Sequence, residues 1–119
     1  MDRHVISFRA KQQGLECTNG FARFASGTEG YIYARFVLDD LWQSFDSVKA
    51  VWANDEKKYE QTITHDTEAA VPAGVLGRRS GVEVNLVGYA VDGGVTTQIL
   101  TTYPCLALVI DRTALTEGE

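Results

Sequence analysis

The sequence predicts an all-β protein: an antiparallel β-sandwich, Ig-like or jelly-roll-related, of about eight to ten short strands. Polar and apolar residues alternate with a period of two through most of the chain, and Gly, Asp and Asn interrupt this alternation about every ten residues. Helical periodicity is almost absent. Because the chain also contains no internal repeat, linker or low-complexity run, we expect residues 1–119 to form a single domain.

The first predicted strand spans residues 4–10, and its core face carries Ile6, Phe8 and Ala10. Further along, Asn19-Gly20 separates two short apolar segments. Asn-Gly is a favoured two-residue hairpin turn. We therefore expect residues 15–17 and 21–25 to flank a hairpin turn.

The strongest strand signal runs from Tyr31 to Leu38. Its core face is predicted to carry Ile32, Ala34, Phe36 and Leu38. The opposite face carries Tyr31, Tyr33, Arg35 and Val37. A second buried strand, Ser47 to Ala53, places Trp52 on its core face, and a polar turn should join it to Tyr59 to Thr64 as a hairpin.

The C-terminal half is predicted to contain an edge strand and a long hairpin. Pro72 cannot donate a ladder hydrogen bond, so the segment around it is expected at a sheet edge. The long strand that follows should point these residues inward: Val82, Val84, Leu86, Gly88 and Ala90. Asp92-Gly93-Gly94 is a strong turn signal that should return the chain through Val95 to Thr102, before a last strand over Cys105 to Ile110.

Composition excludes several classes of partner. The 11 basic and 16 acidic residues give a net charge of −5, and no basic run is present to neutralise phosphates, so we expect no nucleic acid. The longest apolar run is far shorter than the roughly 20 residues that span a bilayer, so we expect no membrane. We also expect no secretory signal, because Met1-Asp2-Arg3-His4 leads straight into alternating polar residues. Cys17 and Cys105 are too few for a disulfide framework and are interpreted as free thiols.

No chemical motif emerges from the polar residues. The two histidines, His4 and His65, lack the spacing of a zinc site, and no Gly-rich phosphate loop is present. We therefore expect no metal, no cofactor and no enzymatic activity. A hydrolase would require two carboxylates, or a nucleophile and a base, to converge in a pocket.

Aromatic residues on the outward faces are the candidate functional residues. We predict interface anchors at Tyr31, Tyr33, Arg35, Val87 and Tyr89, with Trp42 ordering the adjacent loop. Two alternatives remain open. The same faces could be covered by ordinary packing, or aromatic rings could form a sugar-binding platform, for which the candidates are Trp42, Tyr59 and Tyr103.

The order of several short motifs resembles the N-terminal β-sandwich domain of phage baseplate upper proteins and related prophage tail minor structural proteins of Gram-positive hosts. The motifs span roughly residues 5 to 110 and are Ser26-Gly27-Thr28-Glu29-Gly30-Tyr31, Ala34-Arg35-Phe36, Leu41-Trp42, Phe45, Val48 to Trp52, Val71-Pro72 and Gly81 to Gly88. Where the family often has Cys just before the proline, this chain has Ala70-Val71.

The resemblance implies a non-catalytic structural module of a phage or prophage tail or baseplate. Such a module would be made in the bacterial cytoplasm and located in the virion. Its partners would be further copies of itself and other tail or baseplate components. Because such modules usually precede a receptor-binding or fibre region, the resemblance implies a scaffold or fibre-attachment role. The alternative is a small carbohydrate-binding β-sandwich module, with a glycan as its ligand.

Overall fold

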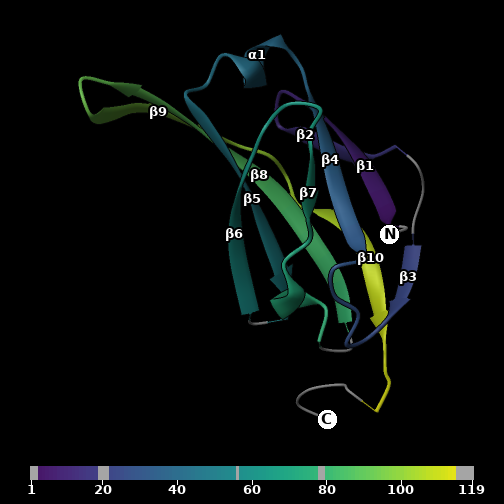
Figure 1. Cartoon of the computed structure of the whole chain (residues 1–119). Helices are drawn as coiled ribbons and strands as arrows, with labels where there is room; N and C mark the ends of the chain where they lie inside the picture. The colour runs from purple at the N-terminus through teal and green to yellow at the C-terminus, as the bar shows by residue number, and fades with distance from the viewer. Residues whose placement is uncertain (1–2, 19–21, 56, 78–79, 115–119) are drawn as a thin grey trace.

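Two β-sheets packed face to face make up the fold (Figure 1). The structure is a computed structural model that describes residues 3–18, 22–55, 57–77 and 80–114. These residues form ten strands, one short α-helix and one turn of 3-10 helix. The expected all-β sandwich is therefore confirmed, with a strand number at the upper end of the predicted range.

The smaller sheet contains four strands in the order β2-β1-β4-β7. Their bounds are β1 (His4–Lys11), β2 (Gly14–Cys17), β4 (Ile32–Leu38) and β7 (Glu68–Ala70). The edge position of β7 agrees with the expectation from Pro72, which follows it and begins the 3-10 turn η1 (Ala73–Val75).

The larger sheet contains six strands, with β9 paired to β8 beside the path β3-β10-β8-β5-β6. Their bounds are β3 (Ala22–Ala25), β5 (Ser47–Asn54), β6 (Lys57–Ile63), β8 (Ser80–Asp92), β9 (Val95–Thr101) and β10 (Cys105–Asp111). The predicted hairpins β5–β6 and β8–β9 are both present. Their turns contain residues with positive φ, Asp55 in the first and Gly93 and Gly94 in the second.

Two details of the predicted topology are wrong. The sandwich is not purely antiparallel, because β1 pairs with β4, and β3 with β10, in parallel. The hairpin expected around Asn19-Gly20 does not form: β2 pairs with β1 in the smaller sheet, whereas β3 joins the larger sheet. Asn19 and Gly20 themselves lie outside the described residues. Parallel neighbours require a crossover between them, and here the chain makes one by changing sheets.

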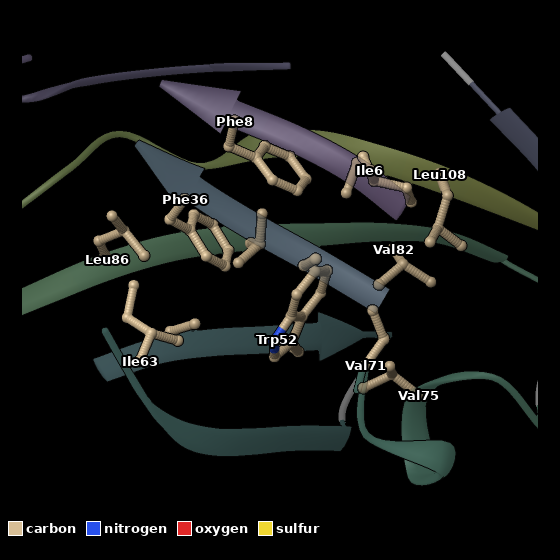
Figure 2. Close-up of a cluster of buried hydrophobic side chains, with 14 of the residues drawn as sticks. Ile6, Phe8, Phe36, Trp52, Ile63, Val71, Val75, Val82, Leu86 and Leu108 are labelled. Atoms are coloured by element: carbon tan, nitrogen blue, oxygen red, sulfur yellow. The ribbon is translucent and has the colours of Figure 1, made fainter. Parts of the chain in front are cut away.

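An aromatic cluster joins the two sheets at the centre of the core (Figure 2). Phe8 and Phe36 stack with ring centroids 4.8 Å apart, and the Trp52 ring meets each of them edge-on at 6.2 Å. The indole N–H of Trp52 donates to Oε1 of Gln61 at 3.1 Å, so the burial of this side chain leaves no unpaired polar atom. The predicted core position of Trp52 is confirmed.

Helix α1 (Asp40–Gln43) closes one end of the core with a second tryptophan. Asp39 caps it by accepting a hydrogen bond from the backbone N–H of Trp42 at 3.0 Å. The buried Trp42 indole donates to the carbonyl oxygen of Gln12 at 2.7 Å and packs beside Phe45. A Cβ added at Gly88 would lie only 2.9 to 3.0 Å from these two rings. A glycine is therefore required on β8 beneath the helix.

We predict that Gly88→Ala lowers the free energy of unfolding by about 1–3 kcal/mol, because the rings of Trp42 and Phe45 must shift to accommodate the methyl group. Urea unfolding followed by circular dichroism measures the change. Gly81→Ala is the matched control on the same strand, since its Cβ meets only the flexible end of the exposed Leu106 side chain. Equal stability of the two variants would contradict the packing argument.

Candidate interaction surface

The six predicted interface residues do not form one surface. Tyr33 and Arg35 lie on the outer face of β4 in the smaller sheet, and Tyr31 immediately precedes that strand. Val87 and Tyr89 lie on the outer face of β8 in the larger sheet. Because the two sheets pack through their inner faces, these two groups point away from each other. The sixth residue, Trp42, belongs to α1, and its side chain is buried.

The outer face of the smaller sheet is charged. Arg3 donates from Nε to Oε1 of Glu68 at 2.6 Å, and its guanidinium lies over the Tyr33 ring at 5.5 Å. Arg35 forms a longer ion pair with Asp66, with 3.6 Å between Nε and Oδ1. The pKa of Glu68 lies below its ordinary value, chiefly because of the hydrogen bond from Arg3. Tyr33 and Arg35 thus belong to a network of opposite charges.

The outer face of the larger sheet carries an apolar stripe. The alternation of β8 points Val87, Tyr89 and Val91 outward, and the register with β9 places Ile99 directly opposite Tyr89. Val91 is 43% exposed and Ile99 is 59% exposed. We call these four residues the outer stripe. The four side chains of the stripe are uncharged, and Lys49 borders it on β5, directly opposite Val87.

One end of the larger sheet projects beyond the sandwich as a two-stranded hairpin (Figure 1). Strand β5 begins opposite Tyr89, so β8 continues past this point without β5 beside it. We call residues 90–99 the hairpin arm. Asp46, just before β5, closes the edge of β8 there: its N–H donates to the carbonyl of Tyr89 at 2.9 Å, and its Oδ2 accepts from the N–H of Val91 at 2.6 Å.

Sequence reasoning missed the arm and the exposure of Ile99 and Val95. Val95 is 65% exposed. A signal was present, since the apolar residues of β9 do not alternate as they do in strands that cover a core. Leu100 is its one residue that packs against the core cluster.

The positions of the titratable side chains in the described residues bear on whether the chain could hold a metal ion. Among residues 3–18, 22–55, 57–77 and 80–114, no three His, Cys, Asp or Glu side chains gather as a metal site. A hollow of about 280 Å³ beside α1 is lined in part by His65, but Nδ1 of this ring already accepts a hydrogen bond from the backbone N–H of Leu38 at 2.9 Å. Within the same described ranges, no helix is long and apolar enough to cross a membrane.

Neither Cys17 nor Cys105 forms a disulfide, in agreement with their interpretation as thiols. Cys17 ends β2 and Cys105 begins β10, and both are partly buried. Burial raises the pKa of Cys105, which reduces its thiolate fraction and hence its nucleophilicity at neutral pH.

The three aromatic rings considered for a sugar platform do not share one exposed surface. Trp42 is fully buried. The ring of Tyr59 is partly buried and lies so close to Gly74 that a Cβ there would overlap it. Tyr103 is the exposed member of the three, at 72%.

No protein-family model and no curated protein matches this chain. Among solved structures, the chain is similar to the N-terminal domain of phage TP901-1 ORF48, with a TM-score of 0.54 and 12% sequence identity. The similarity covers 93% of this chain and 99% of that chain. At this level of identity, it shows a shared fold.

We predict that Arg3→Gln returns the pKa of Glu68 toward its ordinary value, because the variant loses both the short hydrogen bond and the nearby positive charge. A lowered carboxyl pKa stabilises the fold above the ordinary carboxyl range, and this contribution is lost as the pH falls through the folded-state value. Carboxyl ¹³C NMR titration measures the change. Arg23→Gln, which breaks the separate pair with Asp111, is the control and should leave Glu68 unchanged. An unaltered Glu68 titration in Arg3→Gln would contradict the assignment.

Proposed function

We propose that this chain is a non-catalytic structural module of a phage or prophage tail or baseplate, assembling through protein–protein contacts. The observation that carries the proposal is the fold similarity to the phage domain over nearly the full length of both chains. A location in the virion tail follows from it. The sequence motifs that resemble those of baseplate upper proteins support the same assignment independently of the fold similarity.

The outer stripe supports contact with protein. Exposed apolar side chains that lie side by side on a rigid sheet mark interaction surfaces, and tyrosine is among the residues that contribute most to binding. Tyr89 is held in place by its strand neighbours and by Lys49, whose Nζ lies 5.8 Å from the ring centroid. Val87 and Tyr89 are thus proposed as anchors, together with Val91 and Ile99.

The smaller sheet offers a second, more polar surface. Tyr31, Tyr33 and Arg35 lie there beside the pair formed by Arg3 and Glu68. Such a surface suits a partner that brings complementary charges, such as another tail or baseplate component, or an attached fibre. Trp42 would act indirectly, because it fixes the end of the sandwich from which the hairpin arm projects.

We predict that Tyr89→Glu weakens assembly by about 2 kcal/mol or more, roughly 30-fold in the dissociation constant, because it places a charge at the centre of the outer stripe. Light scattering coupled to size-exclusion chromatography, over a concentration series of the purified chain, measures the association. Circular dichroism verifies that the fold is retained.

Tyr33→Glu is the companion variant on the opposite face, and it should disrupt assembly if the smaller sheet also contributes anchors. A loss of association confined to Tyr33→Glu would contradict the outer stripe as a contact surface. A chain that stays monomeric at high concentration and binds glycans on an array, with binding lost in Tyr103→Ala, would replace the proposed function with the carbohydrate-binding alternative.

A further inference from the structure

Strand β9 exposes an unpaired edge. It pairs with β8 along one side, and within the described ranges no strand pairs with its other side. Alternate residues of an edge strand direct their N–H and C=O groups outward, where these groups can form hydrogen bonds with another strand. The side chains on this strand are mostly exposed, including Val95 and Ile99.

The other free edges carry features that oppose strand addition. Edge strand β2 contains Glu16, β3 contains Arg23, and β7 is only three residues long and is soon followed by Pro72. Edge strand β6 carries several charges along its length. The side of β8 left free beyond β5 is closed by the carboxylate of Asp46.

The sequence of β9, Val-Thr-Thr-Gln-Ile-Leu-Thr, has no charged residue and no proline. Its composition therefore differs from that of the other edges, and its one irregularity is the register shift against β8 between Ala90 and Val91. An uncharged strand can pair with a second copy of itself without placing like charges opposite each other. This matters because two copies of a chain with a net charge of −5 repel each other over most of their surfaces.

We propose that β9 pairs edge-to-edge with β9 of a second copy, so that two larger sheets join into one continuous sheet across a two-fold axis. The ladder between β8 and β9 shifts register here, with Gln98 opposite Ala90 and Thr96 opposite Val91, so Thr97 has no partner on β8. Antiparallel pairing of the two copies about Gln98 would bring the two Ile99 side chains close to each other beside the axis. The two outer stripes would become continuous through their Ile99 residues.

This inference rests on the proposed function in one respect: it identifies the surface and the partner for self-association. Its physical basis, an uncharged open edge on a projecting hairpin, is separate from the fold similarity. A partner strand from a different protein is the competing occupant, and a mixing experiment between charged variants distinguishes it from a second copy.

The test compares Ile99→Lys, Ile99→Glu and the wild type by sedimentation velocity over a concentration series. Either charge at this exposed position should weaken dimerisation by at least about tenfold, because like charges meet across the axis. An equimolar mixture of the two variants should recover the dimer, because lysine then lies beside glutamate. Val37→Lys is the matched control, since Val37 is an exposed valine on the outer face of the smaller sheet.

Hydrogen exchange supplies a second measurement on the unmodified chain. Amides of β9 that point away from β8 should exchange more slowly as the protein concentration rises, whereas amides at the other sheet edges should not change. Ile99→Lys should abolish this concentration dependence. Because Ile99 is exposed, its replacement should not unfold the chain, so a loss of dimerisation reports on the contact. Circular dichroism verifies that each variant is folded.

Each outcome either supports or overturns the pairing of β9 with a second copy. Dimerisation that is lost in both variants and recovered in the mixture supports pairing of β9. Dimerisation that survives Ile99→Lys overturns the pairing of β9 but leaves the proposed assembly function intact. The effect of Tyr89→Glu then shows whether the contact lies on the outer stripe. A monomeric wild type whose β9 exchange is independent of concentration also overturns it, and the glycan array then decides on the proposed function separately.

Discussion

The contact between the stacked pair Phe8 and Phe36 and the edge of Trp52 determines how the rest of the molecule is arranged. Phe8 and Phe36 face each other because β1 and β4 pair in parallel in this register, and Trp52 reaches them from the other sheet. A shift of one residue in any of these strands would turn a large aromatic ring into solvent. Because side chains alternate between the two faces of a strand, these inward positions also determine that Tyr33 and Tyr89 point outward.

The hairpin arm follows from the length of β8. This strand has 13 residues, while β5 beside it has eight. The last inward position that helix α1 and its adjoining loop cover closely is Gly88, where Trp42 and Phe45 lie against the backbone. Beyond Tyr89, β9 is the remaining strand partner of β8, because β5 begins opposite Tyr89 and β10 pairs with the other end of β8. The arm therefore depends on backbone pairing with little core beneath it.

The sequence was sufficient to predict which residues of each strand face inward, because burial of one face imposes a period of two. The period of two predicted the core faces of β1, β4, β5 and β8, and the turn residues predicted both long hairpins. It was insufficient to predict which sheet each strand joins. Asn19-Gly20 favours a local turn, yet β3 pairs with β10 far along the chain, with Ala22 opposite Leu108. For the same reason, Tyr33 and Tyr89 were assigned correctly as outward residues but not to opposite sides of the molecule.

The distribution of charge among the edges favours closed pairing of β9 over open-ended addition of strands. If β9 paired with a different edge of the next copy, each addition would leave a new edge available, and the assembly could grow without limit. Pairing of β9 with itself consumes both open edges at once, so it closes at two copies. Glu16, Arg23 and the charges of β6 disfavour the competing edges, and Asp46 closes the side of β8 nearest the arm. Because β9 is uncharged and the other sheet edges carry charges, the proposed pairing both permits dimerisation and stops assembly through strand edges at two copies.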